Sequence, residues 1–267
     1  MTAPELSYYN IANGIISFST TRHGGCSRGN YGEFNINEYC GDEAEAINKN
    51  RKALAAELGI DADHMIIPHQ THGIETRQIA EDFLSLPENI RKMILEGVDA
   101  VMTNIKGVCV GVSTADCIPI LLYDPEHEAV CAVHAGWRGT VARIVVKAVT
   151  EMRLAYQTKP SNLKAVIGPG ISLDAFEVGN EVYEEFANAN FEMDAISKQM
   201  KVTGTDFEYK WHIDLKECNR RQLLQCGINE ENILVSDVCT YNNVEDFFSA
   251  RRLGTASGRI YSGIIIR

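Results

Sequence analysis

The chain has 267 residues, and its 45% hydrophobic and 23% charged residues are typical of a globular protein, which excludes disordered and fibrous classes. Its formal net charge of −11 repels phosphate backbones and anionic lipids, so we expect no nucleic-acid binding, and any anionic ligand must occupy a local basic pocket. Because a chain of this length buries a large core as one unit, we expect a single domain over residues 1–267.

The sequence carries no sign of export or membrane attachment. Its first ten residues lack a basic start followed by an apolar run, and no later stretch stays apolar for about 18 residues. We therefore expect a cytoplasmic protein that does not associate with membranes. The eight cysteines form no Cys-x-x-Cys pair, and we interpret them as reduced thiols, most of them buried like small hydrophobic residues.

Hydrophobic periodicity predicts a strand and a long helix in the N-terminal part of the chain. Ile15 to Thr21 alternates as a strand and leads into a Gly-Gly turn. A helix is expected from a cap at Asp42 to a stop at Gly59, with Leu54 and Leu58 on its buried face.

Short apolar runs in the middle of the chain predict closely spaced strands. They lie at Met65 to Pro68, Ala100 to Thr103, Val108 to Ser113, Ile118 to Tyr123 and Ala129 to Val133. The later elements are a helix at Thr140 to Tyr156, a strand at Leu163 to Ile167, helices at Gly179 to Asn188 and Asp214 to Cys226, and a closing strand at Arg259 to Ile266. The polar stretch from Glu192 to Lys210 is expected to be a surface excursion. Strands mixed with helices, without a strict βαβ rhythm, predict an α+β fold of mixed β-sheets flanked by helices.

Three polar segments lie where predicted strands begin or end: His69 to Gly73, Thr114 to Cys117, and His134 to Gly139. Two histidines and a cysteine suit zinc, and three protein ligands leave a fourth tetrahedral position open for water or substrate. The spacing alone does not select three ligands from seven histidines and eight cysteines. A histidine at a strand end is more often a hydrogen-bonded structural residue, and His23, His64, His127 and His212 keep that interpretation.

The same segments together resemble the YfiH-like family, once called laccase-domain or multicopper polyphenol oxidases and now regarded as purine nucleoside phosphorylases. The matching motifs are Thr20 to Ser27, Gln70 to Gly73, Thr114 to Leu122, Val133 to Gly139, Ile167 to Gly170, Phe176 to Gly179, Cys239 to Thr240 and Phe247 to Arg252. The sequence departs from the family pattern at Gly170, Ala250 and Leu253, none of which is an implied ligand.

The resemblance implies a fold related to that of a toxin deamidase and a metal held by His72, Cys117 and His134. The implied metal is Zn²⁺, with copper as the alternative. The implied reaction is phosphorolysis of adenosine, inosine and methylthioadenosine, with adenosine deamination as a side activity. Purine nucleosides and inorganic phosphate are then the partners, whereas the sequence leaves the oligomeric state open.

Phosphorolysis requires a phosphate site in this acidic protein. Glycine amides and guanidinium groups suit phosphate oxygens, so we expect Arg22, the Gly24-Gly25 turn and Arg138 to contribute to that site. Arg138 is counted with His72, Cys117 and His134 among the catalytic residues, and the expected substrate-binding residues are Arg22, Gly25, Asn35 and Glu177. Arg28, Arg251 and Arg252 are weaker candidates. Asp116 and Glu177 are carboxylates that could move protons, although a hydrogen bond that fixes a loop is favoured for Asp116.

Three other classes of function stay open on the sequence. A copper-dependent polyphenol oxidase would need more than one His₂Cys cluster to build a multicopper centre. A metal-free cysteine hydrolase would use Cys117 as nucleophile and His134 as base. An editing factor for peptidoglycan precursors would keep the pocket and lose turnover. The zinc deaminase pattern, His-x-Glu with Pro-Cys-x-x-Cys, is absent, so any deamination here would not follow that mechanism.

Overall fold

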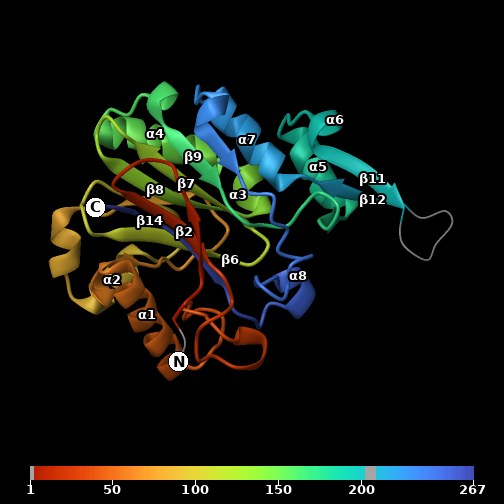
Figure 1. Ribbon diagram of the computed structural model, residues 1–267. Helices are drawn as coiled ribbons and strands as arrows, with labels where there is room; N and C mark the ends of the chain where they lie inside the picture. The colour runs from red at the N-terminus through yellow and green to blue at the C-terminus, as the bar shows by residue number, and fades with distance from the viewer. Residues whose placement is uncertain (1–2, 202–208) are drawn as a thin grey trace.

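The computed structural model describes residues 3–201 and 209–267, and the strands in this part of the chain form three sheets (Figure 1). The five-stranded sheet contains, in order, β1 (Leu6–Tyr9), β2 (Ile15–Thr20), β14 (Ile260–Ile266), β6 (Cys109–Thr114) and β3 (Met65–Ile66). The six-stranded sheet contains β13 (Ile233–Val235), β9 (Lys164–Ile167), β7 (Ile118–Asp124), β8 (Ala129–Ala135), β5 (Val98–Thr103) and β4 (Glu75–Gln78). The three-stranded sheet contains β10 (Glu177–Val178), β12 (Tyr209–Ile213) and β11 (Ser197–Lys201).

The helices in the described residues vary in length from about one turn to about four turns. They are α1 (Ala44–Leu58), α2 (Glu88–Ile94), α3 (Trp137–Val141), α4 (Ile144–Tyr156), α5 (Asn180–Asn188), α6 (Met193–Ile196), α7 (Leu215–Gln225) and α8 (Ala250–Leu253). The combination of mixed sheets and surrounding helices confirms the predicted α+β class.

The two larger sheets pack face to face, and helices cover their outer faces. Between them, Val110 and Val112 of β6 share a buried apolar cluster with Leu121 of β7 and Val130 of β8. On the far side of the six-stranded sheet, α4 and α7 bury their apolar faces, and on the far side of the five-stranded sheet α1 does the same (Figure 1). The main body therefore has four layers, in the order helix, sheet, sheet, helix.

The central strands are buried along their whole length, which explains their continuous hydrophobic runs. Every residue of β5, β6, β7 and β8 is buried. A strand that is covered on both faces has no solvent side, so it lacks the alternation of a half-exposed strand. These four strands form a rigid frame, and both polar segments that adjoin them, before β7 and at the end of β8, are held in place by it.

Two boundaries of the predicted helices were wrong. Asp42 does not cap α1: its carboxylate accepts hydrogen bonds from Ser27 Oγ and Asn35 Nδ2 and thereby fixes the preceding loop, and the helix begins two residues later. The helix expected from Thr140 to Tyr156 is two helices, because Arg143 has a left-handed backbone (φ 64°) that separates α3 from α4.

The polar stretch from Glu192 to Lys210 contains α6, β11 and the start of β12, and residues 202–208 of this prediction lie outside the described residues. It belongs to the three-stranded sheet, which extends beside α5 away from the main body (Figure 1). The described part of this stretch therefore contributes a short helix and strands of a small sheet.

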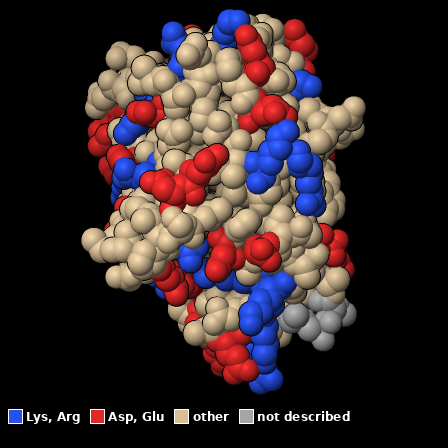
Figure 2. All heavy atoms as spheres, turned by 90° about the vertical axis from the view of Figure 1, so that its left-hand side faces the viewer, with Lys and Arg blue, Asp and Glu red and all other residues tan. Residues whose placement is uncertain are grey.

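The visible surface carries charges of both signs. Figure 2 shows Asp and Glu side chains mixed with Lys and Arg on the face that lies at the left of Figure 1, with no continuous basic area there. Among the described residues, no helix is both long enough and apolar enough to cross a membrane.

Candidate metal centre

Three distant segments place His72, Cys117 and His134 together. His72 lies in the loop after β3, Cys117 immediately precedes β7, and His134 lies near the end of β8. Strands β7 and β8 are antiparallel, and Pro119 pairs with His134, so the start of β7 lies beside the end of β8. The potential ligand atoms of the three side chains lie within 4.8 Å of one another. The three residues that the family resemblance implied therefore form one cluster.

Asp99 connects two members of this cluster. It is fully buried on β5, and its Oδ1 lies 2.7 Å from His134 Nδ1, which leaves Nε2 of that ring for the cluster. The same carboxylate accepts backbone N–H groups from Thr71 at 3.2 Å, His72 at 3.0 Å and Gly73 at 2.8 Å. A carboxylate that orients a ligating histidine in this way is a common second layer of metal sites. Asp99 was not among the residues predicted from the sequence, although a charged residue inside a buried apolar strand is a signal of such a role.

Two further contacts fix the loop that carries His72. Gln70 donates from Nε2 to the carbonyl of Ser113 at 2.8 Å and accepts the N–H of Ser113 at 2.7 Å, so its amide pairs with β6 as another strand would. Gly136 faces the cluster, and a Cβ there would lie 2.9 Å from His72 Cδ2 and 3.2 Å from Cys117 Sγ. A side chain at position 136 would therefore displace the cluster.

The electrostatic environment favours a charge pair between Cys117 and His134, in which the thiolate is the form of Cys117 that binds metal, whereas His134 must release its proton to act as a ligand. Burial opposes ionisation of Cys117, but the charge of His134 and hydrogen bonds with both histidines lower the thiol pKa to about 6. Burial likewise opposes ionisation of Asp99, and His134 with the loop N–H groups still holds the pKa of this carboxyl below its usual range. Burial disfavours the charged form of His134, but Cys117 and Asp99 raise the pKa of its imidazole to about 9. A thiolate and two imidazoles suit Zn²⁺ or copper better than Mg²⁺ or Ca²⁺.

The cluster opens onto a cavity of about 270 Å³. Besides the cluster, the lining includes Asn37, Tyr39, Cys40, His69, Gln70, Ser113, Thr114, Ala115, Ala250, Thr255 and Arg259. These lining residues include one arginine, Arg259. Its Nη1 donates to the carbonyls of Ser257 and Gly258 and its Nη2 to that of Thr255, while Nε has no acceptor among the residues that the structure describes. Arg259 was not among the residues predicted from the sequence, because it follows the last motif and resembles a surface arginine.

The rings of Tyr39 and His69 form part of the cavity wall. They are stacked, with centroids 4.1 Å apart and an interplanar angle of 20°. His69 Nδ1 also lies 2.8 Å from Glu96 Oε1, which anchors the outer side of this wall.

The two arginines expected from the sequence lie elsewhere. Arg22 donates from Nε to the carbonyl of Gly32 and from Nη1 to that of Val244, so its guanidinium fixes two loops. Arg138 is exposed on α3, and its guanidinium lies 4.3 Å from the ring centroid of Trp137. Neither arginine lines the cavity at the cluster.

The other expected substrate-binding residues also lie outside the cavity lining. Gly25 is in a tight turn, where a Cβ would lie 2.1 Å from the carbonyl oxygen of Glu33. Glu177 is exposed on β10, and its backbone carbonyl accepts a hydrogen bond from Arg251. Asn35 is fully buried, and its Oδ1 accepts the N–H groups of Asn37 and Arg259, both of which line the cavity.

Asp116 has the loop-fixing geometry that the sequence analysis favoured. Its Oδ1 accepts from Thr240 Oγ1 at 2.7 Å, and its Oδ2 accepts the N–H of Arg251 at 2.7 Å. The residue has a left-handed backbone (φ 83°) directly before Cys117. Asp116 therefore holds the chain reversal that brings Cys117 into the cluster.

The fold and the cluster together define a layered α+β protein with a His₂Cys site at the mouth of a cavity. Residues 16–267 match the family described as multi-copper polyphenol oxidoreductase laccase, and the chain belongs to that family. A protein named purine nucleoside phosphorylase, from Bacteroides thetaiotaomicron, is 46% identical over 97% of this chain and 93% of its own length. A protein named adenosine deaminase RL5, from an unknown prokaryotic organism, is 41% identical over 97% of both chains.

The fold has a solved counterpart of nearly the same extent. The crystal structure of the hypothetical protein YfiH from Bacillus licheniformis superposes with a TM-score of 0.88 at 27% identity, covering 99% of this chain and 97% of that one. The resemblance to the YfiH-like family is confirmed, and the names of the relatives support an enzymatic role for this chain.

Proposed function

We propose that this chain is a zinc-dependent purine nucleoside phosphorylase that acts on adenosine, inosine and methylthioadenosine. The observation that carries the proposal is the His₂Cys cluster at a cavity of about 270 Å³ that also presents Arg259. The relative named purine nucleoside phosphorylase, at 46% identity over nearly the whole chain, supports the same reaction.

The proposed reaction exchanges one bond at the ribose. An oxygen of phosphate forms a bond to the anomeric carbon, and the bond from that carbon to the purine nitrogen breaks. The bonding electron pair leaves with the purine, which takes up a proton, so the products are the free base and ribose 1-phosphate. Positive charge builds on the sugar during this exchange, and a correctly held phosphate anion both attacks and stabilises it.

The residues of the chain would hold the substrates for this exchange. Arg259 is the permanent cation of the cavity lining and would bind phosphate through its unused Nε–H. The stacked rings of Tyr39 and His69 provide an aromatic surface against which a purine ring would pack. His72, Cys117 and His134 would hold the zinc, which supplies a Lewis acid that polarises an oxygen atom when bound. Asp99 keeps His134 and the His72 loop in position.

The deciding experiment incubates the purified chain with inosine, with and without inorganic phosphate. We expect hypoxanthine release to depend on phosphate and the sugar product to be ribose 1-phosphate. Free ribose as the only sugar product, or a rate indifferent to phosphate, would contradict the proposal and favour a hydrolase.

A pair of variants tests which arginine binds phosphate. Arg259→Gln should raise the phosphate concentration needed for half-maximal rate by about tenfold or more, since a charge-assisted contact to the anion is lost. Arg138→Gln removes the same charge outside the cavity lining and serves as the control. If Arg138→Gln raised this phosphate concentration and Arg259→Gln did not, Arg138 would be the phosphate-binding residue, as the sequence motif suggested.

Adenosine deamination is the second candidate, and the relative named adenosine deaminase RL5 favours it. Water would add at C6 of the purine, ammonia would leave, and inosine would form. Ammonia release from adenosine without phosphate measures this activity, and Arg259→Gln should reduce it less than phosphorolysis.

If chelation leaves every activity intact while alkylation of Cys117 abolishes it, the cysteine-hydrolase alternative is correct instead.

Polyphenol oxidation by a multicopper centre receives less support. Within the residues that the structure describes, a single group of three metal-binding side chains occurs. Elemental analysis of protein purified without added metal should find close to one zinc per chain, and several copper ions per chain would contradict this expectation.

A further inference from the structure

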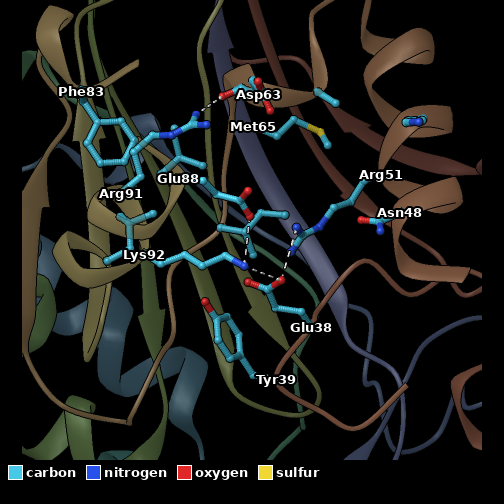
Figure 3. Close-up of a pocket in the computed structure, with 15 residues that line it drawn as sticks. Glu38, Tyr39, Asn48, Arg51, Asp63, Met65, Phe83, Glu88, Arg91 and Lys92 are labelled. Carbon is cyan, nitrogen blue, oxygen red and sulfur yellow. Dashed lines mark hydrogen bonds and ion pairs between the residues drawn. The ribbon is translucent and has the colours of Figure 1, made fainter. Parts of the chain in front are cut away.

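A second cavity, of about 310 Å³, lies between α1 and α2 (Figure 3). Its apolar lining includes Met65, Ile66, Ile67, Phe83 and Leu95, which are all buried. Its polar lining is Glu38, Tyr39, Asn48, Arg51, Lys52, Asp63, Glu88, Arg91 and Lys92. The volume is in the range of small-molecule sites, and none of the proposed metal ligands lines this cavity.

Basic side chains enter this cavity from both helices. Arg51 projects from α1, and Lys92 projects from α2 toward the same carboxylate, Glu38 (Figure 3). Both pairs are long, with Arg51 Nη1 at 3.7 Å and Lys92 Nζ at 3.6 Å from Glu38 Oε2. The lining contains four basic residues and three carboxylates, which is a local excess of positive charge in a protein whose formal net charge is −11.

Two of the cations retain unused binding capacity. Arg91 donates from Nη1 to the carbonyl of Asp63 at 3.5 Å, and its Nε is buried without a partner among the described residues. A ligand in the cavity would therefore reach Arg91 through its terminal nitrogens, of which Nη2 makes no hydrogen bond with the described residues. Lys52 is exposed at the rim and forms no ion pair with any residue that the structure describes.

The second cavity and the metal cavity share a wall. In the segment 37–40, Asn37 and Cys40 line the metal cavity, Glu38 lines the second cavity, and Tyr39 lines both. Tyr39 stacks on His69, which lines the metal cavity, and the N–H of His69 bonds to the carbonyl of Leu95, which lines the second cavity. A molecule in either cavity thus contacts the partition that closes the other.

We propose that the second cavity is an effector site for a small molecule that carries a flat ring and a phosphate group, such as a purine nucleoside monophosphate. The ring would pack against Phe83 and Met65, and the phosphate would be bound by Arg91 and Lys52. Because Tyr39 lines both cavities, a ligand in one would change the affinity of the other, and this coupling would act equally in both directions. The site lies outside the proposed reaction and does not depend on it.

The test measures binding of adenosine 5′-monophosphate by calorimetry, with adenosine and inorganic phosphate as separate probes. The nucleotide should bind more tightly than either fragment. Arg91→Gln and Lys52→Gln should each weaken nucleotide binding by about tenfold, whereas Lys49→Gln, which removes an α1 charge outside the cavity, should not. Equal affinity in all three variants would overturn the proposal, and phosphate alone binding as tightly as the nucleotide would overturn the ring requirement.

A second readout tests the shared wall without measuring activity. Cys40 lies in the partition, so its alkylation rate should change when the nucleotide is added to the wild-type chain and should stay unchanged in Arg91→Gln. The Cys117→Ala variant, with the metal site removed, should bind the nucleotide as the wild type does. Loss of binding in Cys117→Ala would mean that the nucleotide occupies the metal cavity instead.

Discussion

Asp99 is the residue on which the geometry of the cluster depends most. It is the shared hydrogen-bond acceptor for the ring of His134 and for three consecutive N–H groups of the His72 loop. A neutral amide has one oxygen for these four donors, and its NH₂ group would face an N–H instead of accepting it. We therefore expect metal affinity at this candidate site to depend on a residue that is not itself a proposed ligand.

We predict that Asp99→Asn weakens zinc binding by about 10- to 100-fold, the loss expected when a ligating histidine loses its carboxylate partner. A competition titration against a chromogenic chelator measures this change. Asp124→Asn is the control, because Asp124 is equally buried and also binds a histidine, His127, at 2.9 Å, far along β7 from the cluster. Equal zinc affinity in wild type and Asp99→Asn would show that the carboxylate only supports the fold.

The cysteines of the metal cavity should differ in their pH dependence. The pKa of Cys117 is lowered to about 6, whereas burial raises that of Cys40 above its ordinary value. The thiolate is the reactive form, and its fraction rises as the pH passes the pKa. In chelator-treated protein we predict that Cys117 alkylation rises through about pH 6 and is level by about pH 7.5, where Cys40 is still mostly protonated.

Peptide mass spectrometry after brief iodoacetamide treatment measures both rates in one sample. Added zinc should protect Cys117, because the metal competes for its thiolate. A midpoint for Cys117 near that of an ordinary thiol, about 8.5, would contradict the proposed electrostatic environment.

At the residue level the sequence predicted the three residues of the cluster but not the residues that orient them. His72, Cys117 and His134 lie in motifs specific enough to select them, and the structure brings their side chains together. Asp99 has no motif and acts through hydrogen bonds to segments that are distant in sequence. Arg259, which lines the same cavity, follows the last motif. The expected roles of Arg22 and Arg138 in substrate binding stay predictions, and both lie outside the cavity lining.

Among the secondary-structure elements, the N-cap of α7 was predicted correctly from the sequence and that of α1 was not. Asp214 caps α7, with its Oδ1 accepting the N–H of Glu217 at 2.9 Å. Asp42 lies in a similar position before α1, but its Oδ2 accepts from Ser27 and Asn35 and its Oδ1 accepts the N–H of Glu43, which precedes the helix. A sequence pattern identifies a residue that can cap a helix, and tertiary contacts decide whether it does.

We predict that Asp214→Ala lowers the free energy of unfolding by about 1 kcal/mol, the usual loss for removing an N-cap side chain. Glu43→Ala is the control, because Glu43 precedes α1 without a side-chain capping bond and should change stability little. Urea unfolding followed by circular dichroism compares the two variants. A similar loss in both would indicate an effect of charge rather than of capping.

The strands that the sequence predicted differ from those it missed in the strength of their hydrophobic pattern. The strands β5 to β8 are wholly buried and mostly apolar, so their pattern is strong. Strands β4 and β11 have mostly polar, partly exposed residues, and β10 has two residues. Such strands form because a sheet edge is available for hydrogen bonding, which is information that their own sequence does not contain.

For the whole molecule, the cluster lies where the two packed sheets meet. His134 belongs to the six-stranded sheet, Cys117 lies in the connection from β6 to β7 between the two sheets, and the loop of His72 is bonded to both sheets through Gln70 and Asp99. The apolar clusters between and around the sheets are formed by other residues. We propose on this basis that residues 1–267 form one catalytic domain that folds without zinc and is stabilised when zinc binds.

We therefore predict that chelation lowers the melting temperature of the wild-type chain but leaves it folded. A ligand at 100 times its dissociation constant stabilises the native state by about 2.7 kcal/mol, which for a chain of this size corresponds to a shift of about 5–10 °C. Cys117→Ser should melt at the same temperature with zinc and with chelator, because one of the three ligands is missing. Cys40→Ser, a change in the same cavity that removes no proposed ligand, should respond to zinc as the wild type does. Differential scanning calorimetry at matched zinc activity makes the comparison. A chelated wild type without a cooperative transition would mean that the metal is required for folding, and a zinc response that persists in Cys117→Ser would place the metal elsewhere.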